Sequence, residues 1–193
     1  IYDRAGMRDI FTLLPMVFSF IIPAVTMRLF AEEMNIGSYE TLLTMPVSFT
    51  DIAVGKFTAA LLFTAAMLLP TLSYPVFISF LGELDPGPVI GGYIGALLLG
   101  GAYCAIGLFA SSLTRSQIIA FIIGSAICFT LTVMDRLLVL IPAGLASIVE
   151  FMSAASHFQN IAKGVIDSRD IVYFLSIMFI AVFGTYLVMK ERN

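Results

Sequence analysis

Few side chains in this sequence could do chemistry, and their spacing does not build a catalytic site. His157 is the one histidine, and Ser156, a possible nucleophile, is its immediate neighbour. On a helix, adjacent side chains point in different directions, so the hydroxyl and the imidazole would diverge instead of meeting. We therefore expect no hydrolase site at His157.

The sequence also lacks the residues that a metal site or a nucleotide site would need. One histidine and two cysteines, Cys104 and Cys128, fall short of a zinc ligand set, and both cysteines lie in apolar stretches where a packing role is expected. A Gly-Lys pair ending at Lys56 is like the end of a phosphate-binding loop. However, Phe57 stands at the Ser/Thr position and Thr50 at the first glycine of such a loop. The sequence thus predicts no cofactor, metal or nucleotide, and no enzymatic activity.

The composition defines the class of protein. Of 193 residues, 60% are hydrophobic and only 12% are charged, with a mean hydropathy of +1.01. A soluble domain of this size would need far more charge to cover its surface. The net charge of -3 and the lack of a basic cluster argue against a nucleic-acid partner. We predict an all-α polytopic membrane protein with a single transmembrane domain over residues 1–193.

Long apolar runs predict about five membrane-spanning helices, because about 20 apolar residues cross a bilayer. They cover about residues 10–27, 57–81, 89–113, 118–134 and 171–189. None of these ranges contains an Asp, Glu, Lys, Arg or His. An ion-coupled transporter needs such groups despite a cost of roughly 2.5 to 3.5 kcal/mol each, so that class is disfavoured. Two prolines in each of the first two spans predict bends.

Residues 28–56 form the longest polar insertion between two apolar spans. Gly37 is expected to end a first short helix, and Ser48 with Asp51 three residues later predicts the start of the next long one. Helical spacing would place three apolar side chains on one side, with the carboxylates turned elsewhere. These apolar residues are Ile36, Tyr39 and Leu43, and the carboxylates are Glu33 and Glu40.

Residues 135–170 predict an irregular region at the outer membrane interface. Apolar residues recur at helical spacing between Leu145 and Ala155, which favours a helix lying in the interface over a sixth span. We interpret His157 as an interfacial polar residue of this region.

Small residues recur every four positions in the third and fourth spans, which lets helix backbones approach closely. They are Gly92, Ala96, Gly100 and Cys104 in the third span, and Ala120, Gly124 and Cys128 in the fourth. Packing within the chain is the favoured interpretation. A subunit interface or a substrate groove stays open as an alternative.

The polar insertion resembles the signature of type 2 ABC-exporter permeases, in which a charged, glycine-interrupted stretch precedes a Leu-Leu-x-x-Pro run and a Gly-Lys pair. The resemblance implies that this segment couples to an ATP-binding subunit, through Glu32, Glu33, Gly37, Glu40, Leu43, Pro46 and Lys56. More narrowly, three segments are similar to gliding-motility-associated permeases. They are IPAVTMR at 22–28, AIGLFASSLT at 105–114 and GVIDSRDIVYFLS at 164–176.

The resemblance implies a multi-pass protein of the bacterial cytoplasmic membrane that exports a substrate while a separate ABC ATP-binding subunit hydrolyses ATP. It also implies a dimer with a second permease copy or paralogue, an extracytoplasmic accessory protein in some assemblies, and a cytoplasmic position for residues 28–56. Positive charge does not decide the orientation, because the two sides would carry five Lys and Arg each.

Two expectations stay open beside this one. Family members typically have six spans, so the first span is expected to be missing from this chain. The alternative function is a membrane anchor that passes ATPase movement to an extracytoplasmic partner in a motility or secretion complex, without a transported substrate.

Overall fold

The computed structural model describes residues 8–39, 47–81, 85–137, 149–165 and 167–191. All regular structure in these ranges is helical, and five helical stretches are long and apolar enough to cross a membrane. They are Ile10–Ile36, Phe49–Phe80, Pro86–Leu113, Gln117–Arg136 and Ser168–Glu191. The predicted fold class, an all-α polytopic membrane protein, is confirmed.

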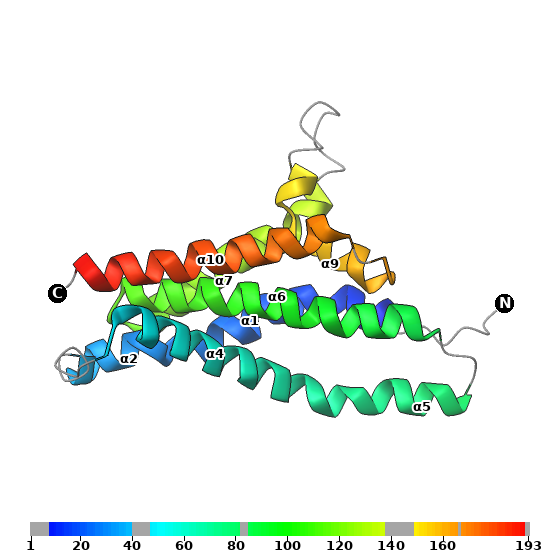
Figure 1. The fold of residues 1–193 in the computed structure, drawn as a ribbon, viewed down its shortest axis with the longest axis horizontal. Helices are drawn as coiled ribbons and strands as arrows, with labels where there is room; N and C mark the ends of the chain where they lie inside the picture. The colour runs from blue at the N-terminus through cyan, green and yellow to red at the C-terminus, as the bar shows by residue number, and fades with distance from the viewer. Residues whose placement is uncertain (1–7, 40–46, 82–84, 138–148, 166, 192–193) are drawn as a thin grey trace.

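The long helices run side by side and alternate in direction along the chain (Figure 1). In order they are α1 (Arg8–Thr26), α2 (Arg28–Ile36), α4 (Phe49–Leu68), the 3₁₀ helix η1 (Leu69–Leu72), α5 (Ser73–Leu81), α6 (Pro86–Leu113), α7 (Gln117–Leu137), α9 (Ala154–Ala162) and α10 (Ser168–Glu191). Because of the alternation, α2, the start of α4 and the end of α10 meet at one end of the bundle, here called the α2 end. The opposite end, which carries α9 and α5, is called the α9 end.

Helix α6 forms the centre of the molecule. In its most apolar window 78% of the residues are buried, whereas no other candidate span exceeds 39%. It packs against α1, α4, α7, α9 and α10. Its Tyr103 is fully buried, with its hydroxyl 2.6 Å from the hydroxyl of Thr132 on α7. The other spans therefore surround α6 and turn much of their apolar surface outward.

The small residues of α6 lie where neighbouring helices come closest. A Cβ added at Gly92 would stand 2.3 Å from the ring of Phe11 on α1, and one at Gly100 would stand 2.8 Å from a methyl group of Thr64 on α4. Ala96, between them, is fully buried. Because Gly92 and Gly100 carry no side chain, Phe11 of α1 and Thr64 of α4 can lie directly against the α6 backbone.

A second close approach joins α1, α6 and α7. A Cβ at Gly107 of α6 would lie 1.9 Å from the hydroxyl oxygen of Thr26 on α1. One at Gly124 of α7 would lie 3.4 Å from Cβ of Pro23 and 3.5 Å from Cβ of Ala110. The backbones of α1, α6 and α7 therefore lie close together at these two glycines.

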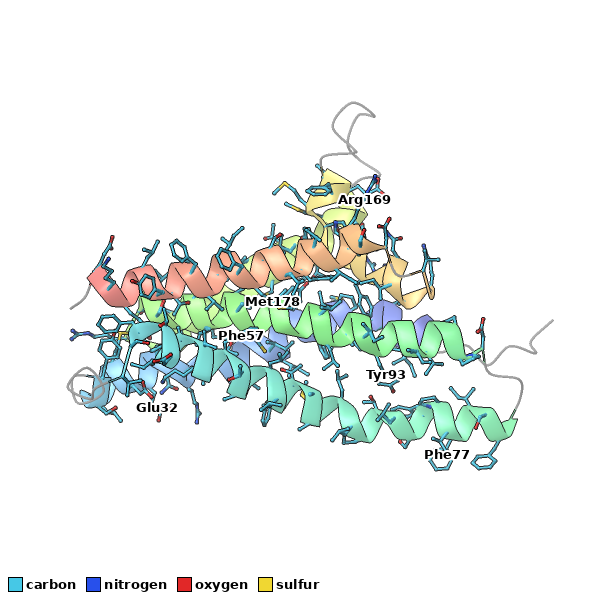
Figure 2. All side chains as sticks on the ribbon, in the orientation of Figure 1. Glu32, Phe57, Phe77, Tyr93, Arg169 and Met178 are labelled. Carbon is cyan, nitrogen blue, oxygen red and sulfur yellow. The ribbon has the colours of Figure 1, made fainter. Side chains whose placement is uncertain are left out.

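The largest helix–helix contact among the described residues is that of α6 with α10, and it is reciprocal. Gly101 of α6 receives Met178 of α10, whose terminal methyl group would lie 2.5 Å from an added Cβ. Gly184 of α10 receives the ring of Phe109 of α6, at 3.0 Å from an added Cβ. Figure 2 shows Met178 between the two helices. Each helix thus fills a gap left by a glycine in the other.

One of the two prolines expected to bend the second span, Pro70, lies where its α-helix is interrupted, whereas Pro75 lies within α5. Helix α4 gives way to η1 at Leu69, next to Pro70, and α5 follows. The Tyr93 hydroxyl of α6 donates to the carbonyl of Thr71 at 2.7 Å and so holds η1 against the bundle. Beyond this point Phe77 of α5 points away from the other helices (Figure 2) and is 66% exposed.

The region between the fourth and fifth spans differs from its sequence prediction. The expected continuous helix from Leu145 to Ala155 lies partly outside the described residues, and its described part is broken at Ser153. The Ser153 hydroxyl accepts a hydrogen bond from the backbone N–H of Ser156 at 3.2 Å and so caps α9. A capping serine begins a new helix, and the apolar spacing did not reveal this boundary. Helix α9 has nine residues, a rise of about 14 Å, and is too short to cross a bilayer.

The side chain of His157, interpreted from the sequence as an interfacial polar residue, is buried inside the protein. It is 7% exposed, and its Nδ1 lies 2.6 Å from a carboxylate oxygen of Asp170 on α10. Its Nε2 lies 3.0 Å from the carbonyl of Phe151, and its ring stacks on Tyr173 at 4.1 Å. This cluster fastens α9 to the first turn of α10.

Candidate functional site: the segment around α2

Helix α2 is amphipathic and sits at the α2 end with one face on the bundle. Phe30, Ala31 and Met34 are buried, and their cluster includes Leu108 of α6 and Ala53 of α4. The opposite face carries Glu32, Asn35 and Ile36, and Ile36 is 69% exposed. Figure 2 shows Glu32 on the side of α2 that faces away from α6. Together with the exposed Arg28 in the first turn, these residues give α2 a small surface of mixed charge and polarity.

The junction of α1 and α2 is held by a side chain from another helix. Met27 has helical backbone angles, and no side-chain hydrogen bond from Met27 itself caps α2. Ser111 of α6 supplies the cap: its hydroxyl oxygen accepts from the N–H groups of Phe30 and Ala31, both at 3.0 Å, and donates to the carbonyl of Met27 at 2.8 Å. One buried hydroxyl thus satisfies three backbone groups that the break would leave without partners.

Lys56 fastens α2 to α4. Its ammonium lies 2.5 Å from a carboxylate oxygen of Glu33, donates to the carbonyl of Leu29, and stands 4.5 Å from the ring centre of Phe30. The Lys56 side chain is 17% exposed and that of Glu33 is 32% exposed. Both predicted coupling residues are therefore paired with each other within the chain.

Gly37 ends α2, as predicted. Its φ of 78° lies in the left-handed region, which glycine adopts without a steric cost. The predicted common side for Ile36 and Tyr39 is wrong, since Ile36 is exposed whereas Tyr39 is only 8% exposed. The left-handed turn at Gly37 resets the helical phase, so residues three apart across it no longer share a face.

The start of α4 also follows the sequence prediction. The Ser48 hydroxyl accepts from the N–H of Asp51 at 3.2 Å and lies 2.5 Å from the Asp51 carboxylate. This is the expected cap, with the returning contact made to the hydroxyl instead of the backbone.

Three predicted coupling residues, Glu40, Leu43 and Pro46, lie outside the described residues. Of the others, the structure brings Glu33 and Lys56 together and places Glu32 and Gly37 on and just after α2. Sequence reasoning missed Ser111, since a serine near the end of an apolar run carries no signal of the backbone groups that it binds. In the described ranges, no group of three or more His, Cys, Asp or Glu side chains could hold a metal ion.

A bundle of five candidate spans with a short amphipathic helix seated at one end defines a class of multi-pass helical membrane proteins. Residues 1–154 match the family model described as "ABC-2 family transporter protein", so the chain belongs to the ABC-2 family. It is a permease subunit of an ABC transporter, and its family associates in general with ABC ATP-binding subunits. No individual curated protein matches the chain.

Proposed function

We propose that this chain is the membrane-spanning permease of an ATP-driven exporter, and that α2 receives the movement of a separate ATPase subunit. The observation that carries the proposal is the position of α2. It is held to α6 by Ser111 and to α4 by Lys56, while its outer face carries the exposed Asn35 and Ile36 and the partly exposed Glu32. Because α2 is attached to α6 and α4, a force on its outer face would move these helices together with it.

The outer surface of α2 suits a partner that offers an apolar contact surrounded by polar groups. Glu33 is paired with Lys56, and Glu32 lies on the outer face near the exposed Ile36, one helical turn after the exposed Arg28. An apolar anchor supplies most of the affinity in such contacts, whereas a rim charge mainly guides association.

The narrower assignment to the gliding-motility-associated permeases is part of the proposal. The three similar segments include residues that make tertiary links in the structure. Segment 22–28 contains Thr26 and Met27, which contact Gly107 and Ser111 of segment 105–114. Segment 164–176 contains Asp170, the partner of His157. A dimer with a second permease, the bacterial cytoplasmic membrane and an extracytoplasmic accessory protein complete the proposed assembly.

Copurification of the ATPase subunit with permease variants tests the docking surface. Ile36→Ala should weaken the complex by about 1 to 2 kcal/mol if Ile36 is an anchor. Glu32→Lys should slow association and make it depend on salt concentration. A double variant that retains the ATPase and its permease-dependent ATP hydrolysis at every salt concentration would remove the basis for the proposal.

Glu191→Lys is the matched control. It makes the same charge change at the same end of the bundle, on the exposed last residue of α10 instead of on α2. It should leave copurification unchanged. Reconstituted vesicles then separate export from the anchor alternative, because only an exporter moves a solute across the bilayer as ATP is consumed.

A further inference from the structure

Helix α6 contacts α2 at one end and α9 at the other. At the α2 end, the buried hydroxyl of Ser111 holds the backbone of α2 through three hydrogen bonds. At the α9 end, Gly91 lies so close to α9 that an added Cβ would stand 2.3 Å from the carbonyl oxygen of Ile161. Twenty helical residues separate Gly91 from Ser111, a rise of about 30 Å, which matches the hydrocarbon core of a bilayer.

The helix between these two contacts is well suited to move as a rigid body. Helix α6 is continuous over 28 residues, and its prolines lie within its first turn. In contrast, α1 contains Pro15 and Pro23, and the α4–α5 rod is interrupted by η1. Helix α7 also contacts both α2 and α9, but its contact with α2 is smaller than that of α6.

Helix α9 is positioned to respond to a displacement of α6. Besides the Gly91 contact, a Cβ at Gly95 would lie 3.1 Å from the ring of Phe158, so α9 rests directly on the α6 backbone. Helix α9 also packs against α1 and α7, and the buried pair of His157 with Asp170 joins it to α10. A shift of α6 relative to α1, α7 and α10 would therefore act on α9 through its contacts at Gly91 and Gly95.

We propose that α6 carries a displacement of α2 across the membrane to α9, and that Ser111 is the positioning residue for the first step. This inference rests on the proposed function, because α2 must first receive a displacement from the ATPase. It adds the path by which ATP binding at one end changes the structure at the other.

Two environment-sensitive labels in the assembled permease–ATPase complex in lipid vesicles test the two steps separately. One is attached to Asn35→Cys on α2 and the other to Asn160→Cys on α9, and both positions are exposed. The native Cys104 and Cys128 are buried, and the chain without an added cysteine is the labelling control. A non-hydrolysable ATP analogue should change the signal of both labels.

Ser111→Ala should leave the response at Asn35 and reduce the response at Asn160 by at least about twofold, because α2 loses its hydrogen bonds to the Ser111 hydroxyl of α6 and keeps apolar contacts such as that with Leu108. Ser112→Ala is the matched control. Ser112 is equally buried, but its hydroxyl donates only within α6, to the carbonyl of Phe109 at 2.7 Å. It should leave both responses unchanged. A normal Asn35 response also reports that each variant is folded and assembled.

A second variant tests the other end without touching Ser111. Gly95→Ala should push on Phe158 and alter the Asn160 response alone, whereas Gly55→Ala, where nothing lies within 4 Å of the added Cβ, should alter neither. A wild-type response at Asn160 in Ser111→Ala would overturn the inference. A wild-type chain that responds only at Asn35 would overturn the inference and leave the proposed function standing, and one that responds at neither position would overturn both.

Discussion

The contact of Gly107 with Thr26 gives the sharpest test of the packing described above. An added methyl group at Gly107 would lie 1.9 Å from the Thr26 hydroxyl oxygen, about 1.5 Å inside an ordinary contact, and 3.0 Å from its Cβ. Thr26 is fully buried, and its hydroxyl donates to the carbonyl of Ile22 at 2.9 Å, so it has little freedom to turn away. Gly107→Ala should therefore force α1 and α6 apart and destabilise the chain by about 2 to 3 kcal/mol.

Reversible unfolding in lipid–detergent mixtures measures this loss. The double variant Gly107→Ala, Thr26→Ala should recover much of it, because the oxygen is removed and only the 3.0 Å contact with Cβ remains. A double-mutant cycle then isolates the coupling between the two positions.

Gly55→Ala provides the control for the intrinsic effect of replacing a helical glycine. Nothing lies within 4 Å of its added Cβ, so it should stabilise α4 by about 0.5 to 1 kcal/mol. If Gly107→Ala were as stable as the wild type, or if removing the Thr26 hydroxyl gave no recovery, the close approach of α1 and α6 would be refuted.

Three further predictions concern the polar links. Lys56→Met should destabilise the α2 end by about 1 to 3 kcal/mol and speed hydrogen exchange in α2, because Glu33 loses its partner. Adding Glu33→Gln should recover part of the lost stability. An unchanged exchange rate in Lys56→Met would contradict the link between α2 and α4. Asp170→Asn should loosen α9 by about 1 to 3 kcal/mol, seen as faster exchange there, and equal protection would show that His157 does not need the carboxylate. Ser48→Ala should cost about 1 kcal/mol in unfolding experiments, and no loss would mean that the cap is not formed.

Local signals in the sequence predicted the features that depend on neighbouring residues. Hydropathy predicted the five candidate spans, Gly37 predicted the end of α2, and Ser48 predicted the start of α4. Each of these depends on a single stretch of chain, through apolar length, a left-handed turn or a cap.

Features that depend on distant residues were not predictable in the same way. Ser111 binds N–H groups 80 and 81 residues away, and Lys56 binds the carbonyl of Leu29, 27 residues before it. Asp170 gives His157 a buried partner that helical spacing cannot reveal. The side assigned to Tyr39 failed because the periodicity was extended across Gly37, where the helix ends.

The reciprocal contact of α6 with α10 bears on how the chain folds during synthesis. Helix α10 comes last in the described chain, and Met178 follows Gly101 by more than 70 residues. Until α10 is inserted, the gap at Gly101 has no Met178 to fill it, and the ring of Phe109 lacks its seat at Gly184. Because such non-local contacts form late, the surface of α6 that binds α10 is expected to stay uncovered until α10 is inserted. The packing of the central helix is therefore completed only when the last described helix has joined the bundle.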